Sequence, residues 1–403
     1  MAGITGVIAF DKVWNVSKFI YYSLLALRHR GQDQFAFFIC GDECKVKVVE
    51  ELRDLKVEEL NGWIGVGFTG TENRTIREGN HFLAYDGEVK DEVRLIRKLK
   101  EIDDKAKAFE GEGVFSAIYT NSREIFAYRD PSGNKPLFLG GFGFDLGIVS
   151  SEPSGIEVIG GEVGREVESG ELIRINQYGV FKQKTGDGDR FLCSLEFIYL
   201  QRIDSHFSGK QIYDVRERIG RQLAIERKIE GDVVIGVPET AIPFAIGYSK
   251  ETKIPYSLGF TRTGDSKRTM IMNDAFERLI GVQLKLNPIK SVVWDKRVIV
   301  IDDSMVTGNT LKNTVFLLRK NGAKEVHVLI ASPKLTSLCP YGVRVPPKEE
   351  LIAANLSDEE IAITIGADSI YWLSFEGMYK AIGLNPENLC IGCFTGKYKK
   401  VIK

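Results

Sequence analysis

A run of four β-branched residues followed directly by two carboxylates constrains the fold of this chain more than any other feature. Residues 298–301 predict a strand that is buried on both faces. Asp302 and Asp303 follow where that strand leaves its sheet, and apolar residues then recur at helical spacing from Leu311. A second apolar run at 326–330 completes a strand–helix–strand unit. Open α/β sheets bind ligands at the carboxyl ends of such strands.

The loop between the acidic pair and the helix has the composition of a phosphate-binding site. Its N–H groups and the positive end of the next helix suit one phosphate, and Gly308 allows a close approach. Asp302 and Asp303 would repel a phosphate, so we expect them to hold ribose hydroxyls or hydrated Mg²⁺. The alternative is an acidic strand end without a ligand. The predicted site comprises Asp302, Asp303, Ser304, Met305, Val306, Thr307, Gly308, Asn309 and Thr310.

This pattern resembles the phosphoribosylpyrophosphate (PRPP) loop of type I phosphoribosyltransferases. The stretches 284–293 and 339–342 narrow the resemblance to glutamine PRPP amidotransferases, and it covers nearly the whole chain. It implies an α/β phosphoribosyltransferase domain with a parallel sheet at 185–403, with PRPP or a purine nucleotide as ligand. Further residues of the implied site are Glu239, Thr240, Arg262, Arg268 and Lys285.

Several residues of the implied PRPP site depart from the family pattern. In the loop that closes over PRPP, Gly264 replaces an arginine and Asp265 a tyrosine, and Lys267 stands where the family has a glycine. In the PRPP loop, Thr307 replaces an arginine and Asn309 a threonine. Each lost arginine removes charge-assisted contacts with a polyanion, worth ~1.5–3 kcal/mol. Binding of the 5′-phosphate is expected to survive. The losses are expected to weaken the closure of the loop over the pyrophosphate.

The first 184 residues have a different pattern. Residues 2–9 predict an opening strand and 16–28 a helix, and short strands separated by glycines dominate from 60 to 180. The pattern predicts an α+β domain of stacked antiparallel sheets. The domain resembles N-terminal-nucleophile glutaminases, so that 1–184 is glutaminase-like. The matching stretches are 3–7, 29–33, 129–137, 151–152 and 168–171.

The chain changes character near residue 185. Residues 185–189 are polar and glycine-rich, which suits a linker, and the apolar run 193–200 predicts a strand. Helices are expected at 212–228 and 241–249, and strands and helices alternate from there. The segment 347–385 is expected to be helical and to cap the sheet.

The residues that would carry glutaminase chemistry are replaced at three matching positions. The family's nucleophile is an N-terminal cysteine exposed by removal of Met1, and this chain has Ala2 there. Phe68 stands where the family has the arginine that grips the glutamine carboxylate. Asp86 replaces the asparagine of the oxyanion pair, where a carboxylate would oppose the developing negative charge. The resemblance therefore implies an inactive glutaminase half without catalytic residues.

Four of the six cysteines match positions that hold a 4Fe–4S cluster in one branch of the family. The two-residue spacing of the last pair lets a single turn bind one centre. A zinc site and four unrelated buried thiols stay open as alternatives. Cys40 and Cys44 lie in a turn and carry no expected role, with metal binding as the minor alternative. The four matching residues are Cys193, Cys339, Cys390 and Cys393.

Composition bears on the partners and on the compartment. The chain has 403 residues and a formal net charge of −1, without a long basic run, so nucleic acid is not an expected partner. No apolar run reaches the length of a membrane span and no secretory signal is evident. The protein is therefore predicted to be cytoplasmic, without a membrane partner.

Two functions fit these features. In the first, the second half displaces pyrophosphate from PRPP with ammonia and forms 5-phosphoribosylamine. In the second, the chain is a non-catalytic relative that binds PRPP or a nucleotide and regulates or scaffolds an active paralogue. Asp302, Asp303 and Arg268 favour the first function, and the altered loop residues favour the second. A homo-oligomer, or a hetero-oligomer with an active paralogue, is expected.

Overall fold

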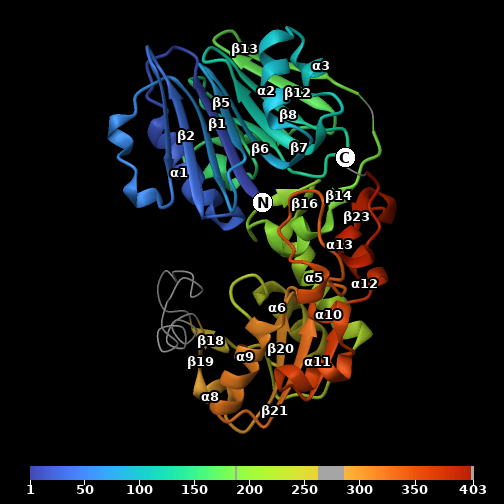
Figure 1. Ribbon diagram of the computed structural model, residues 1–403. Helices are drawn as coiled ribbons and strands as arrows, with labels where there is room; N and C mark the ends of the chain where they lie inside the picture. Colours follow the sequence, from blue (N-terminus) through green and yellow to red (C-terminus); the bar gives the residue numbers. More distant parts are fainter. Residues whose placement is uncertain (187, 262–285, 401–403) are drawn as a thin grey trace.

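The computed structural model describes residues 1–186, 188–261 and 286–400. An N-terminal part, blue to green in Figure 1, contains antiparallel sheets, and a C-terminal part, yellow to red, contains a parallel sheet. This arrangement confirms the predicted fold class. No helix of the described chain is long and apolar enough to span a bilayer.

Two antiparallel sheets pack face to face in the N-terminal part. The first sheet has the order β11 (Glu162–Glu166), β9 (Phe138–Phe142), β10 (Leu146–Ser150), β1 (Ala2–Ala9), β4 (Ile64–Gly70), β2 (Gln34–Cys40) and β3 (Cys44–Val49). The second has the order β13 (Gly179–Lys184), β12 (Glu171–Asn176), β8 (Ile125–Arg129), β7 (Gly113–Thr120), β6 (His81–Val89) and β5 (Thr75–Glu78). The helices of this part are α1 (Ser17–Leu27), α2 (Glu92–Glu101), α3 (Lys105–Phe109) and α4 (Ser154–Glu157).

Alternation of side chains along the strands gives both sheets two buried faces. In β1, Ile4 enters the core between the sheets, whereas Val7 enters the core beneath α1. On the outer face of the second sheet, Leu95 and Leu99 of α2 pack against Phe115 of β7. The result is a four-layer stack of helix, sheet, sheet and helix, with β1 between two cores.

A parallel sheet organises the C-terminal part. Its strands follow the order β17 (Val233–Gly236), β20 (Arg297–Asp302), β21 (Glu325–Ile330) and β22 (Ser369–Trp372). Residues 298–301 are completely buried, as the continuous apolar run predicts. The helices of this part are α5 (Ile212–Glu226), α6 (Ile242–Thr252), α8 (Lys290–Val293), α9 (Asn309–Lys320), α10 (Ile352–Asn355), α11 (Asp358–Ile365), α12 (Phe375–Ile382) and α13 (Gly392–Thr395).

Three short strand pairs complete the described structure. One of them joins the start of the C-terminal part to its tail, because Cys193 pairs with Cys390 in parallel register. The pairs are β14 (Leu192–Cys193) with β23 (Leu389–Cys390), β15 (His206–Phe207) with β16 (Lys210–Gln211), and β18 (Phe260–Thr261) with β19 (Asn287–Pro288).

Two expectations from the sequence are wrong in part. The apolar run 193–200 is a strand only at its start, and Glu196–Leu200 forms a π-helical turn instead. A run of apolar residues without a period fits a buried strand and a buried turn equally well. The segment 347–385 contains α10, α11 and α12, but β22 interrupts it and forms the edge of the parallel sheet.

Candidate functional site

The acidic pair lies at the carboxyl end of β20 and is nearly inaccessible to solvent. The backbone N–H of Asp303 donates to Asp302 Oδ1 at 3.0 Å. Ser304 Oγ donates to Asp303 Oδ1 at 2.6 Å, and the hydroxyl of Thr240 donates to Asp303 Oδ2. Thr240 follows β17, whose register places Gly236 beside Ile301. The structure therefore brings together the two strand ends that the sequence assigned to one site.

Burial raises the pKa of both carboxyl groups, and the charge of Asp303 further raises the pKa of Asp302. Two adjacent buried carboxylates disfavour each other's ionised form. A hydrated Mg²⁺ ion or the hydroxyls of a ribose would relieve that cost, and carboxylate oxygens are ligands that Mg²⁺ accepts while it keeps several waters. The donor set therefore fits the predicted ligands.

The loop after the acidic pair has buried anchors and exposed donors. Met305 is buried in the core, and Val306 O accepts a hydrogen bond from Ile352 N at 3.0 Å. Gly308 has φ of +78°, and a Cβ there would lie 2.9 Å from Ile352 Cδ1, so glycine is required. Thr307 is exposed. Asn309 and Thr310, the first residues of α9, are exposed as well.

Of the two other loops that the sequence assigned to the site, the one after β17 is described, and most of the closing loop is not. Glu239 is exposed beside Thr240, and its peptide bond with Pro238 is cis. Three predicted ligand-binding residues and three substituted positions of the closing loop lie outside the described residues. They are Arg262, Arg268, Lys285, Gly264, Asp265 and Lys267.

Sequence reasoning missed a buried arginine next to the acidic pair. Arg216 is fully buried in α5, and it donates from Nε to Phe197 O at 3.0 Å and from Nη2 to Gln201 O at 2.8 Å. Burial lowers its pKa to about 10, and the negative charge of Asp303 opposes that shift. The signal was present in the sequence, because Arg216 lies on the apolar face of α5 with Ile212 and Ile219.

The structure also brings Ala2 and Asp86 together. The backbone N–H of Ala2 donates to Asp86 Oδ1 at 2.9 Å, and Ala2 O accepts from Arg30 Nε at 2.9 Å. Phe68 pairs in register with Ile4 and is completely buried in the core between the sheets. Its ring is therefore a core side chain.

Arg30 links this region to the C-terminal part through buried ion pairs. It contacts Asp86 at 2.9 Å, Glu152 at 2.8 Å and Glu196 at 2.8 Å. Burial alone would raise the pKa of Asp86, but the charges of Lys135 and Arg30 lower it to about 2. We call Arg30, Asp86, Glu152 and Glu196 the Arg30 network.

The four predicted cluster ligands converge near the junction of the two parts. Cys193 lies opposite Cys390 in the β14–β23 pair, Cys393 follows in α13, and the Tyr341 backbone N–H donates to Cys339 Sγ at 3.4 Å. All four thiols are free. Burial raises the pKa of three of them, those of Cys193, Cys390 and Cys393. As arranged, no three or more His, Cys, Asp or Glu side chains of the described chain could hold a metal ion.

Cys40 and Cys44 form a disulfide across the β2–β3 hairpin. Because the two sulfurs are bonded to each other, the minor alternative that Cys40 and Cys44 bind a metal ion is wrong. The sequence signal was the spacing of four across a glycine-containing turn.

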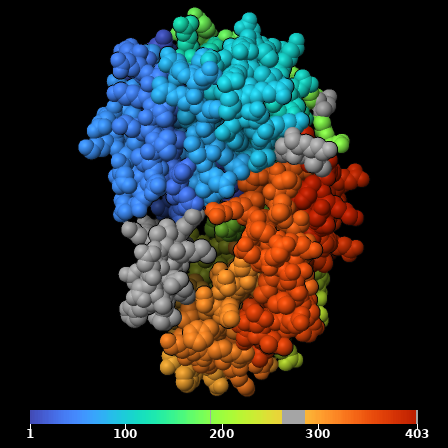
Figure 2. Space-filling view, viewed as in Figure 1, coloured from blue at the N-terminus to red at the C-terminus, as the bar shows by residue number. Residues whose placement is uncertain are grey.

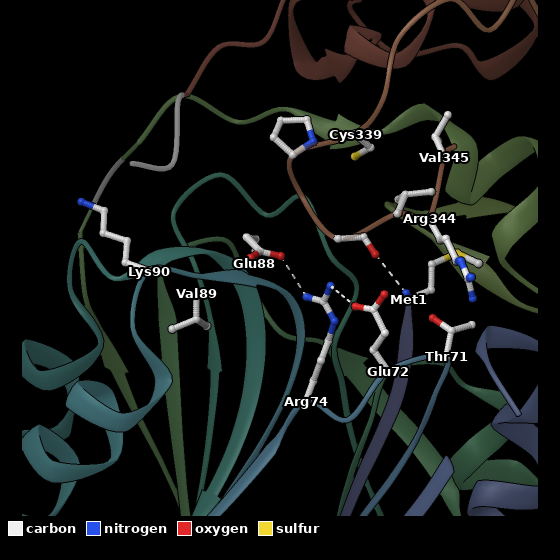
Figure 3. A pocket seen from close by; sticks show the side chains of 13 residues that line it. Met1, Thr71, Glu72, Arg74, Glu88, Val89, Lys90, Cys339, Arg344 and Val345 are labelled. Atoms are coloured by element: carbon white, nitrogen blue, oxygen red, sulfur yellow. Dashed lines mark hydrogen bonds and ion pairs between the residues drawn. The ribbon is translucent and has the colours of Figure 1, made fainter. Parts of the chain in front are cut away.

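A pocket of about 490 Å³ opens where the N-terminal strand meets the loop after Cys339 (Figure 3). The amine of Met1 donates a hydrogen bond to Gly342 O at 2.9 Å, and Arg74 forms an ion pair with Glu88 at 3.2 Å. The loop packs tightly here, since a Cβ on Gly342 would lie 2.6 Å from Gly87 O. The C-terminal part thus covers the chain beside Ala2 and Asp86.

The chain matches a known family model and named relatives from other organisms. A model described as phosphoribosyl transferase domain matches residues 208–337. The amidophosphoribosyltransferase of Methanocaldococcus jannaschii is 34% identical, and the alignment covers 99% of this chain and 97% of the relative. That of Bacillus subtilis is 32% identical, with coverage of 94% and 90%.

Solved structures show the same likeness. The glutamine PRPP amidotransferase of B. subtilis, complexed with ADP and GMP, aligns with a TM-score of 0.87 and 32% identity over 100% of this chain and 98% of its own. A structure described as the allosteric regulatory enzyme of purine biosynthesis aligns with a TM-score of 0.89 and 30% identity, with coverage of 100% of this chain and 97% of its own.

Proposed function

Because the chain belongs to the amidophosphoribosyltransferase family, we propose that it binds PRPP and transfers the phosphoribosyl group to free ammonia. The observation that carries this proposal is the buried pair Asp302 and Asp303, held by Thr240 and Ser304 at the mouth of a strand–loop–helix unit. The surface is hollowed between the two parts of the molecule (Figure 2).

The proposed reaction divides the work among the site residues. The N–H groups of the loop from Ser304 to Thr310 and the start of α9 hold the 5′-phosphate. Asp302 and Asp303 hold the ribose hydroxyls or a hydrated Mg²⁺ ion, which supplies positive charge to the leaving pyrophosphate. Ammonia forms a bond to C1′, the bond from C1′ to the pyrophosphate oxygen breaks with its electron pair, and the nitrogen loses one proton to solvent.

The proposal includes a glutaminase half that is inactive. Ala2 lacks a nucleophilic atom, and its neighbour Asp86 would place a carboxylate against the developing oxyanion. Arg30 pairs with that carboxylate, which favours its ionised form. Ammonia would then come from solution or from a partner protein. We propose the cytoplasm as the compartment on the ground of this chemistry, since the cysteines include both four free thiols and the Cys40–Cys44 disulfide.

The direct test is pyrophosphate release from PRPP and Mg²⁺ with either ammonium or glutamine. We expect turnover with ammonium and no glutamine-dependent turnover. Turnover with glutamine would contradict the proposed loss of glutaminase activity. PRPP binding without turnover under either condition would contradict the proposed transfer of the phosphoribosyl group to ammonia.

A second candidate is a non-catalytic, nucleotide-binding relative that associates with an active paralogue. The observation that favours it is that Thr307 in the loop and Asn309 at the start of α9, both exposed, bring no positive charge to a polyanion. The B. subtilis relative was solved with ADP and GMP. Two measurements separate the candidates. This one predicts that calorimetry detects binding of GMP or PRPP while ammonium-dependent turnover is absent.

We further propose that Cys193, Cys339, Cys390 and Cys393 hold a 4Fe–4S cluster with a structural role. The convergence of four free thiols from both ends of the C-terminal part supports it. In a cluster each thiolate binds a different iron, so the sulfurs stand further apart than around one ion such as Zn²⁺, which binds each sulfur at ~2.3 Å. The chemistry of phosphoribosyl transfer needs no electron transfer, so the cluster would pin the tail to β14.

Anaerobically purified protein tests this assignment. We expect a brown protein with iron and sulfide in a ratio of one to one, and a Cys390→Ser variant that is colourless and less stable. Colourless wild-type protein with bound zinc, or with four thiols that react freely, would contradict the cluster.

A further inference from the structure

Lys135, in the segment between β8 and β9, is the one lysine of the described chain whose side chain is completely buried. Its ammonium group has no hydrogen-bond partner among the described residues. An ammonium group carries three donors, and a buried charge is strongly unfavourable unless it is paired and hydrogen-bonded. The side chain therefore needs an acceptor that the hydrogen bonds of the described chain do not supply.

The two carboxylates nearest in charge to Lys135 already accept hydrogen bonds from other donors. Asp86 accepts from the backbone N–H of Ala2 at Oδ1 and from Arg30 at Oδ2. Both oxygens of Glu196 accept from Arg30, at 2.8 and 2.9 Å. These carboxylates lie within the electrostatic reach of Lys135, but they leave its three donors unused.

The backbone beside Lys135 is hydrogen-bonded to the first of the four free cysteines. Cys193 N donates to Asn134 O at 3.3 Å, and Asn134 Nδ2 donates to Phe191 O at 2.8 Å. On the other flank, Ser116 Oγ donates to Lys135 O at 3.1 Å. These bonds fix Lys135, a residue of the N-terminal part, against the cysteines of the C-terminal part.

The charge of Lys135 also reaches the thiols. Burial would lower the pKa of Lys135, but nearby negative charges raise it, among them those of Cys193 and Cys339. Burial raises the pKa of Cys193 and of Cys390, and the charge of Lys135 opposes both shifts. One buried ammonium group therefore acts on three of the four cysteines.

We propose that Lys135 is the counter-ion of the 4Fe–4S cluster and donates hydrogen bonds to its sulfurs. The inference rests on the cluster proposed above and adds a residue of the N-terminal part to that site. Four thiolates bring more negative charge than the cluster core neutralises, and a cation with donors to the sulfurs stabilises such an anion. The same contact supplies the acceptors that Lys135 lacks. Lys135 has a positioning role and touches no substrate.

The rate of iron release to a chelator under argon tests this assignment. Lys135→Met keeps the length of the side chain and removes its charge, so iron release should become roughly 10- to 100-fold faster, as expected for loss of a group that supports metal ligands. Lys135→Arg restores the charge and should restore the wild-type rate. The matched control is Lys250→Met, which removes the same charge from an exposed pair with Glu217 at 2.7 Å and should leave the rate unchanged.

The colour of the wild-type protein separates this inference from the cluster itself. Colourless wild-type protein would overturn both. Brown wild-type protein whose iron release is unchanged by Lys135→Met would overturn only the role of Lys135, which would then serve Asp86 alone. A colourless or fast-releasing Lys135→Met variant supports the inference if Lys135→Arg behaves as the wild type does. The same defect in both variants would overturn it, because packing and not charge would then be responsible.

Discussion

The Arg30 network and the acidic pair after β20 are both buried, but the pKa of Asp86 in the first centre and the pKa values of Asp302 and Asp303 in the second shift in opposite directions. Burial alone would raise the pKa of Asp86, yet Lys135 and Arg30 lower it to about 2. Burial raises the pKa of Asp302 and of Asp303, and the hydroxyls of Ser304 and Thr240 only partly offset the shift of Asp303. In the first centre Lys135 and Arg30 favour the ionised form of Asp86, whereas the second centre favours a cation or a ligand rich in hydroxyls.

The comparison predicts that the Arg30 network is the more sensitive of the two centres to loss of charge. Arg30→Met leaves Asp86, Glu152 and Glu196 buried without the cation that all three contact, so the free energy of unfolding should fall by about 3–5 kcal/mol. The measurement is the free energy of unfolding of the whole chain from a urea titration. The control is Arg174→Met, which removes an exposed pair with Glu124 and should cost less than ~1 kcal/mol. Equal losses in the two variants would contradict a special role for Arg30.

At the other centre, loss of charge should reduce ligand affinity and leave folding intact. Asp303→Asn keeps the shape of the side chain but removes a charge-assisted contact, worth about 1.5–3 kcal/mol or roughly 10- to 150-fold in the Kd for PRPP with Mg²⁺. Stability of the ligand-free protein should not fall, because a buried charge is removed. Calorimetry measures both ligand affinity and, in a thermal scan, stability.

The matched control for that variant is Asp232→Asn. Asp232 is exposed and pairs with Arg297 at 2.9 Å at the opposite end of the same strands. Its substitution should leave PRPP affinity unchanged. If both variants bind PRPP as the wild type does, the acidic pair is not the ribose or magnesium site.

The two centres should also differ in their response to acid. The folded-state pKa of Asp86 lies below its unfolded value of ~3.8, so its contribution is present above pH ~4 and is lost as the pH falls toward 2. The loss amounts to about 2 kcal/mol, given that this group is fully buried. Unfolding midpoints measured across this pH range should therefore drop more steeply for the wild type than for Asp86→Asn. Parallel curves would show that Asp86 is not paired in solution.

The sequence predicted the local structure of the second centre but not the ion pairs of the first, for a physical reason. The strand, acidic pair, loop and helix at 298–320 are contiguous, so local pattern and turn chemistry predict them together. The pair between Arg30 and Glu196 joins residues 166 apart, and nothing in either segment indicates the other. Arg216 is an intermediate case. Its place on an apolar helix face could be predicted from the sequence, but its proximity to Asp303 could not.

The smallest expected effect is also the sharpest test of the comparison. Restoring a thiol by Ala2→Cys should produce no glutaminase activity, because Asp86 accepts from the backbone N–H of residue 2 and keeps its negative charge beside the nucleophile. Phe68, a buried core ring, still supplies no cation for the glutamine carboxylate. Mass spectrometry must first establish that Met1 is removed, so that the cysteine is N-terminal.

Glutamate release is then measured for Ala2→Cys and for Ala2→Cys/Asp86→Asn. Both should stay at the protein-free background, and ammonium-dependent turnover should match that of the wild type in both. Activity in the double variant alone would assign the loss to Asp86 and exclude Phe68 as a separate obstacle. Activity in Ala2→Cys by itself would mean that the Arg30 network leaves the oxyanion position open. The contrast between the Arg30 network, which is paired within the chain, and the acidic pair, which binds a ligand, would then be wrong for the Arg30 network.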